Sequence, residues 1–211
     1  MRTYGLIALL CLSAPASAQV DLKVREVTHD DVVRLVAAKQ YKPAREVAVQ
    51  CAERTADPNC QLAAAEFLLQ GVGGKVDDRN GLRYLTASAE QGSPAAQALL
   101  GNVYHNGVGV KKDPAQAVAW WERSAGNCNP WAQDAVAHSY FDGELVPKDM
   151  VKAFHWVSIA AHFEYPEADK GAEKLRSLLT PEELAAAAAM TSAFLEKSGC
   201  GTDKPVVTHE P

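Results

Sequence analysis

Two stretches of the sequence, 36 residues apart, share one pattern and decide the fold. Tyr104–Asp113 reads YHNGVGVKKD, and Tyr140–Asp149 reads YFDGELVPKD. Each begins with an aromatic residue, breaks at a glycine and ends at an aspartate. Glycine readily adopts the left-handed conformation that ends a helix, and aspartate accepts the hydrogen bonds that begin one. Each stretch therefore predicts a turn between two helices.

The same interval recurs over half of the chain. Proline, glycine, aspartate, a large aromatic residue and alanine each return at this spacing. The recurring positions are Pro58, Pro94, Pro130 and Pro166; Gly71, Gly107 and Gly143; Asp77, Asp113 and Asp149; Tyr84, Trp120 and Trp156; and Ala89, Ala125 and Ala161. A period of this length is typical of solenoid proteins. We therefore predict three repeats of 36 residues over residues 59–166.

Within each repeat, apolar residues follow helical spacing on both sides of the turn, and a proline fits the first position of a helix. The predicted buried positions of the middle repeat are Ala96, Leu100, Val103 and Tyr104 in the first helix and Ala117, Trp120, Trp121 and Ala125 in the second. A single helical hairpin cannot bury both of its apolar faces, so successive hairpins must stack.

The segment before the repeats predicts a cap for that end of the stack. Thr28 and Asp31 have the spacing of a capping box, and Pro43 is predicted to begin a second helix. We assign residues 19–58 to an N-terminal capping helix pair.

The segment after the repeats predicts a second cap. Residues 167–179 are predicted to continue as a helix, and Thr180 and Pro181 have the residue types that begin another. We assign residues 167–197 to a C-terminal capping helix pair. The polar, glycine-containing residues 198–211 are expected to form a flexible tail.

The first 20 residues, MRTYGLIALLCLSAPASAQV, have the composition of a signal peptide. Arg2 precedes an apolar stretch from Leu6 to Leu12, and Ala16-Ser17-Ala18 is the small-x-small pattern that a signal peptidase cuts. We predict that residues 1–18 are removed and that the mature protein is periplasmic or secreted. The apolar stretch is shorter than the roughly 20 residues that cross a bilayer, so no membrane span is predicted.

Export would place the four later cysteines where disulfides persist. Cys51 and Cys60 flank a short turn and are predicted to pair. Cys128 and Cys200 remain, but they lie two periods apart, and a regular stack would separate them by two layers. Either the tail folds back across the last hairpin, or these two thiols stay unpaired or bond elsewhere.

The charge and the motifs exclude several function classes. The chain has 21 Lys and Arg against 26 Asp and Glu, and this acidic balance argues against nucleic acid as a partner. GxSxG, HExxH, SxxK, P-loop and GxGxxG motifs are absent from the mature sequence. We therefore expect no enzyme activity and no cofactor. The sequence gives no prediction of oligomeric state.

The middle repeat resembles a known family. From Ala96 to Ala125 it follows the pattern A-x-x-x-LG-x-x-Y-x-x-G-x-GV-x-x-D-x-x-x-A-x-x-W-x-x-x-(S/A)A, which is similar to the Sel-one-like repeat (SLR) family, relatives of the tetratricopeptide repeats. Departures are Ala65 and Leu68 in the first repeat, and Ala137 and the turn GELVPKD in the third. The resemblance implies an all-α fold, a right-handed α-solenoid of stacked helix-turn-helix repeats with capping helices at both ends.

The resemblance also implies that the first helix of each repeat lines a concave groove. The groove residues that it implies for a protein or peptide partner are Glu66, Leu69 and Gln70 in the first repeat, Asn102, His105 and Asn106 in the second, and Trp131, Asp134, His138, Phe141 and Asp142 in the third. Trp131 and Phe141 are either exposed anchors for a partner or core residues packed against the preceding hairpin.

Asp134, His138 and Asp142 share one helix face, with His105 expected on the adjoining helix, and such a set could hold zinc. Solvated polar residues are the commoner reading of this pattern, and we predict no metal site.

Two functions follow from the resemblance. Related SLR proteins act as adaptors, and some exported members are immunity proteins that neutralise secreted lipase-type toxins, which implies an exported interaction module here. Other relatives, rich in cysteine, are associated with penicillin binding or weak β-lactam hydrolysis. This chain has neither their paired cysteines in every repeat nor an identifiable nucleophile, so the interaction module is the prediction and the enzyme is the alternative.

Overall fold

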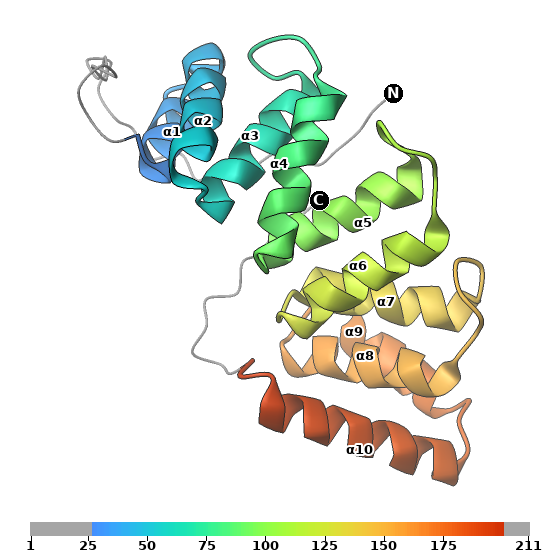
Figure 1. Cartoon of the computed structure of the whole chain (residues 1–211). Helices are drawn as coiled ribbons and strands as arrows, with labels where there is room; N and C mark the ends of the chain where they lie inside the picture. Colours follow the sequence, from blue (N-terminus) through green and yellow to red (C-terminus); the bar gives the residue numbers. More distant parts are fainter. Residues whose placement is uncertain (1–26, 201–211) are drawn as a thin grey trace. The chain divides into compact units, whose positions relative to one another are not determined.

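The computed structural model describes residues 27–200, and this part of the chain contains ten α-helices and no strand. The predicted signal peptide and residues 201–211 of the predicted tail lie outside the described residues. The chain divides into two compact units, one up to Ala96 and one from Gln97 onward, and each is described by itself. Figure 1 shows the ten helices in chain order.

The first unit holds four helices and the start of a fifth. These are α1 (His29–Ala37), α2 (Tyr41–Thr55), α3 (Pro58–Gln70), α4 (Asp78–Glu90) and the first residues of α5 (Pro94–Asn106). The predicted capping box of Thr28 and Asp31 is present at the start of α1. The helix α2 begins at Tyr41, two residues before the predicted start at Pro43, because the first turn of a helix tolerates proline.

The second unit contains the rest of α5 and five further helices. These are α6 (Pro114–Gly126), α7 (Pro130–Asp142), α8 (Met150–His162), α9 (Ala168–Arg176) and α10 (Pro181–Lys197). The hairpin of α7 and α8 packs against α6, and both α9 and α10 pack on α8. Thr180 and Glu183 form a capping box at the start of α10, behind Pro181.

The turns of the three repeats have one geometry. A glycine with positive φ ends the first helix or follows it directly, an aspartate carboxylate caps the second helix, and the backbone N–H of that aspartate donates to a carbonyl near the end of the first helix. These glycines are Gly71, Gly107 and Gly143, with φ of 72°, 73° and 74°. The aspartates are Asp77, Asp113 and Asp149, which donate to the carbonyls of Leu68, Tyr104 and Tyr140 at 2.9, 3.0 and 3.0 Å. The same hydrogen bonds of the turn therefore recur every 36 residues.

The large aromatic residues of the period also fall at one place. Tyr84, Trp120 and Trp156 are the seventh residues of α4, α6 and α8. Tyr84 is buried, whereas Trp120 and Trp156 are half-buried. The prediction that Trp120 belongs to the buried stripe is therefore wrong in part. The guanidinium of Arg123 covers its ring at 4.5 Å, and the buried tryptophan of α6 is Trp121.

The end of the repeat array departs from the period. The predicted helix 167–179 is present only as α9, because Glu167 has a positive φ of 65° and cannot be helical there. The chain leaves the helix again after Arg176, and Leu178 is exposed. Pro166 therefore does not open a helix as the earlier prolines of the period do.

Each unit contains one disulfide that joins two of its segments. Cys51 and Cys60 pair as predicted and tie the end of α2 to the start of α3. Cys128 and Cys200 also pair, with their Cα atoms 5.5 Å apart. Of the alternatives open at the sequence level, the structure has the tail folding back. The reason is that α10 lies along α8, so the chain after it returns to the turn between α6 and α7.

None of the helices within residues 27–200 combines the length and the apolar character that crossing a membrane requires.

Candidate functional site

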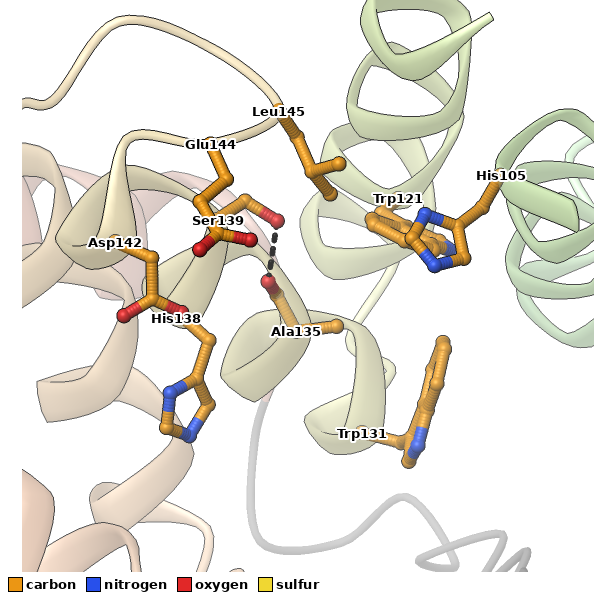
Figure 2. A pocket seen from close by; sticks show the side chains of 9 residues that line it. All are labelled: His105, Trp121, Trp131, Ala135, His138, Ser139, Asp142, Glu144 and Leu145. Atoms are coloured by element: carbon orange, nitrogen blue, oxygen red, sulfur yellow. Dashed lines mark hydrogen bonds between the residues drawn. The ribbon is translucent and has the colours of Figure 1, made fainter. Parts of the chain in front are cut away.

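A cavity of about 270 Å³ opens on the second unit, next to the first half of the α7–α8 hairpin. Figure 2 shows its walls: the end of α5, one side of α6, one face of α7 and the loop after α7. The residues that line it are His105, Trp121, Trp131, Ala135, His138, Ser139, Asp142, Glu144 and Leu145.

Aromatic rings form one wall of this cavity. Trp131 meets Trp121 edge to face, with ring centroids 6.1 Å apart, and His105 lies 5.5 Å from Trp121 on another side. The indole N–H of Trp121 donates to Oδ1 of Asn102 at 3.1 Å, which fixes the orientation of the ring. Such edge-to-face pairs are favourable beyond the area that they bury.

A glycine of α5 makes room for the Trp121 ring. A Cβ added at Gly101 would lie 2.3 Å from Cδ1 of Trp121, a distance that no real contact allows. The third repeat has Ala137 at the equivalent position, and Val157 stands where the middle repeat has Trp121. Gly101 therefore helps to shape the aromatic wall, although it does not line the cavity itself.

Polar side chains form the opposite edge. Asp142 is the last residue of α7, and the left-handed Gly143 turns the chain so that Glu144 follows it at the rim. Both carboxylates are exposed, and neither forms an ion pair with any Lys, Arg or His of residues 27–200. Ser139 is less available, because its hydroxyl donates to the Ala135 carbonyl at 2.8 Å.

Four of the groove residues implied by the sequence line this cavity. They are His105, Trp131, His138 and Asp142. Asn102 lies directly behind the wall as the acceptor of the Trp121 indole. Asn106 is exposed at the end of α5, where its amide donates to the Asn102 carbonyl at 2.9 Å.

Two residues of α7 lie outside the cavity. The Asp134 carboxylate is 3.6 Å from Nε2 of His138; burial raises the pKa of Asp134, and the nearby histidine offsets part of that effect. The Phe141 ring is covered by the ammonium groups of Lys148 and Lys174 at 5.0 and 5.3 Å. Trp131 and Phe141 therefore do not form one exposed surface. Trp131 packs on the preceding hairpin and also lines the cavity, whereas Phe141 lies half-buried on another face.

The groove residues of the first repeat lie in the first unit. The expectation that Leu69 faces a partner is wrong: it is 7% exposed and packs against Gly81 of α4, where even a Cβ would come within 2.7 Å of Leu69 Cγ. Burial raises the pKa of Glu66 to about 7, so this carboxyl titrates near neutral pH. Gln70 is half-buried at the end of α3.

Sequence reasoning missed five of the lining residues, namely Trp121, Ala135, Ser139, Glu144 and Leu145. Trp121 was assigned to the core, and at 6% exposure it is a core residue whose ring edge also faces the cavity. A signal for the loop residues does exist in the sequence. Glu144 stands where the middle repeat has the buried Val108, so the third turn carries an acid that the period does not require.

The suggested zinc ligands do not converge. Across the described residues 27–200, no three His, Cys, Asp or Glu side chains come together in a way that could hold a metal ion. Only Asp134 and His138 of the suggested set form an ion pair, at 3.6 Å.

Comparison with known proteins identifies the repeat from which this architecture is built. The Sel1 repeat matches residues 58–93, 94–127 and 132–162. The crystal structure of a Sel1 repeat protein from Oxalobacter formigenes is 34% identical, with a TM-score of 0.55 over 59% of this chain and 94% of that chain. The chain belongs to the Sel1 repeat family.

A second Sel1-like structure covers more of the described helices. It is a protective antigen present in uropathogenic Escherichia coli strains that displays an SLR fold, 25% identical, with a TM-score of 0.64 over 74% of this chain. The match spans only 33% of that longer protein. None of the curated proteins compared with the chain matches it. These likenesses identify an all-α solenoid, and Sel1 repeat proteins generally mediate protein–protein interaction.

Proposed function

We propose that this Sel1 repeat protein is an exported binding module and that its partner, a protein or peptide, docks at the cavity of the second unit. The observation that supports this best is the aromatic wall of Trp121 and Trp131 in the same cavity as two carboxylates that form no ion pair within residues 27–200. A half-buried tryptophan in a recess, as Trp131 is here, is the kind of anchor that protein interfaces favour. We place binding at this cavity rather than along the whole predicted groove, because Leu69 is buried and Phe141 lies on another face.

The partner that we propose is a secreted toxin of the lipase type, which the chain would neutralise as an immunity protein. The resemblance to exported SLR immunity proteins supports this role, together with the predicted signal peptide. If the gene beside this one encodes a lipase, the two purified proteins should form a complex in which lipase activity is suppressed at a one-to-one ratio. A neighbouring lipase that keeps full activity in excess of this chain would exclude the toxin role and leave the binding module open.

Substitution of Trp131 tests the location of the site. Trp131→Ala should abolish capture of a partner from periplasmic extract while helicity, measured by circular dichroism, stays unchanged. The matched control is Trp120→Ala, which removes a half-buried tryptophan that does not line the cavity. Equal capture by both variants would move the site elsewhere.

Export is a separate part of the proposal. Two disulfides within residues 27–200 favour an oxidising compartment. Cleavage after Ala18 predicts that Gln19 is the first residue of the protein recovered from a periplasmic fraction, as read by mass spectrometry. Recovery of the whole chain from the cytoplasm with all five cysteines reduced would contradict export.

The enzymatic alternative has less support. The serine in the cavity, Ser139, donates its hydroxyl hydrogen bond to the Ala135 carbonyl, and no imidazole of residues 27–200 accepts it. A serine nucleophile needs such a base within hydrogen-bond reach. Turnover of a chromogenic β-lactam above that of the denatured protein would revive the alternative, and equal rates would remove it.

A further inference from the structure

We propose that the cavity of the second unit takes a basic side chain of the partner, with arginine preferred over lysine. This inference rests on the proposed function, because it names the chemistry of the group that docks there. It depends on four features of the lining: size, aromatic surface, charge and the absence of an internal cation.

The size of the cavity fits one side chain. Its volume of about 270 Å³ is below the range of roughly 300–1,000 Å³ typical of pockets for whole small-molecule ligands. A single long side chain, presented by a loop of a folded partner or by a peptide, matches this space better than a cofactor does.

Of the aromatic wall, Trp131 is half-buried and can meet a cation, whereas Trp121 is buried at 6% exposure. The chain places its own cations over other aromatic rings, with Arg83 over Tyr84 at 4.3 Å and Arg123 over Trp120 at 4.5 Å. Over residues 27–200, neither Trp121 nor Trp131 has a Lys or Arg above its ring. A guanidinium against tryptophan is the strongest pairing of this kind.

The charge of the rim has the complementary sign. Asp142 and Glu144 provide two carboxylates, and the lining contains no Lys or Arg. Of the two lining histidines, His138 has its Nε2 directed to Asp134 at 3.6 Å. An apolar side chain in the cavity would displace water from the two carboxylates without offering them a hydrogen-bond donor. A guanidinium at the rim can donate to a carboxylate while its aliphatic stem lies along the apolar lining, and its planar set of donors suits a carboxylate better than an ammonium does.

Peptide titrations test this directly. The ¹⁵N-labelled protein is titrated with acetyl-Gly-Arg-Gly-amide and with the matching lysine and norleucine peptides, and the indole N–H signals of Trp121 and Trp131 are followed by NMR. We expect saturable shifts with the arginine peptide, weaker binding of the lysine peptide by a factor of about five, and no saturation with norleucine. Equal binding of the norleucine and arginine peptides would overturn the proposal.

Charge-neutral variants separate this inference from the proposed function. Asp142→Asn with Glu144→Gln should weaken the arginine peptide at least tenfold and remove the loss of affinity between 50 and 500 mM NaCl, because screening acts on the charges. The matched control, Glu173→Gln with Glu182→Gln, removes two exposed carboxylates away from the cavity and should leave binding unchanged. If the neutral pocket variant captures the natural partner as well as the wild type does, while Trp131→Ala does not, the binding module stands and the basic anchor is wrong.

Discussion

Three buried glutamines, one in each repeat, show how the 36-residue period acts on single side chains. Gln61 accepts from the Gln91 amide at 2.7 Å, and Gln97 accepts from the Asn127 amide at 2.9 Å. The third glutamine, Gln133, donates to the Ala125 carbonyl, but its Oε1 has no partner within the described chain. The residue one period after Asn127 is Phe163, which has no amide to offer. The equivalent positions of the three repeats therefore hold Gln91, Asn127 and Phe163.

This difference predicts unequal costs of one substitution. Gln97→Leu removes a satisfied hydrogen bond and should lower the free energy of unfolding by about 1 kcal/mol. Gln133→Leu gives up one donated bond but also removes a buried acceptor without a partner, so it should be close to neutral. Urea denaturation of both variants measures the difference. If Gln133→Leu is the more destabilising of the two, an ordered water satisfies Oε1 in solution.

A buried histidine predicts how stability depends on pH. His155 of α8 is buried, its Nδ1 lies 3.1 Å from the Thr191 hydroxyl of α10, and Phe194 packs on it edge to face. Burial lowers the pKa of His155 to about 4, from an ordinary value of 6.5. The unfolded chain therefore binds a proton at a higher pH than the folded chain does. The stability from this residue is fully present above pH 6.5 and is lost as the pH falls towards 4.

The variant His155→Gln checks this expectation, because an amide can keep the bond to Thr191 but does not titrate. Between pH 6.5 and 4.5 the melting temperature of the wild type should fall more than that of the variant. His162→Gln is the control, since His162 is exposed on the same helix. Parallel pH profiles for wild type and His155→Gln would show that the ring is accessible to protons in the folded state.

At the scale of the element, a small residue on the first helix of each repeat stands opposite a larger apolar residue on the second helix. The smallest residue, glycine, goes with the largest partner, tryptophan. The middle repeat has Gly101 with Trp121, and the equivalent pairs are Ala65 with Leu85 and Ala137 with Val157. All three residues of the second helices are buried. The pair in the middle repeat thus sets both helix packing and the aromatic wall of the cavity.

Gly101→Ala should destabilise the second unit, because its Cβ would meet the Trp121 ring at 2.3 Å. Overpacking of this kind costs typically 1–3 kcal/mol even though alanine favours the helix. The reverse change in the next repeat, Ala137→Gly, should cost about 1 kcal/mol through helix propensity alone. Near-UV circular dichroism should change with Gly101→Ala and not with Ala137→Gly. An unchanged tryptophan signal in Gly101→Ala would mean that α5 and α6 can separate without cost.

The helices could be predicted from the sequence because their boundaries are local. Proline at the first position, glycine with positive φ and aspartate as a cap act within a few residues of each other, and each recurs with the period. The predicted helix 167–179 is present as the shorter α9, which begins at Ala168 and ends at Arg176. The local signal at Pro166 was the same, and the positive φ of Glu167 is not visible in a residue type.

The site was predictable only in part, because it depends on how α7 is turned. Phe141 follows Trp131 by ten residues, which at about 100° per residue places it roughly 80° round the helix. Helical spacing identifies such faces, but only packing decides that Trp131 meets Trp121 while Phe141 lies under Lys148 and Lys174. Glu144 and Leu145 come from a loop, where no period predicts direction.

At the scale of the whole molecule, the two disulfides differ in the length of chain that they close. Cys51 and Cys60 are 9 residues apart, whereas Cys128 and Cys200 are 72 apart. A longer loop loses more entropy when it is closed in the unfolded chain. The longer one also joins the end of α10 to the turn before α7, so it ties α10 to the rest of the second unit, which this helix otherwise contacts mainly through α8.

Removal of the second disulfide should therefore cost more than removal of the first. In the chain-entropy account, Cys128→Ser with Cys200→Ser loses about 4 kcal/mol, and Cys51→Ser with Cys60→Ser loses about 3 kcal/mol. Amide hydrogen exchange gives the sharper readout, because each pair acts within one unit. Exchange in residues 181–197 should speed up in the first variant and stay as in the wild type in the second. Unchanged protection of α10 without its disulfide would show that the contacts of His155 with Thr191 and Phe194 hold the helix by themselves.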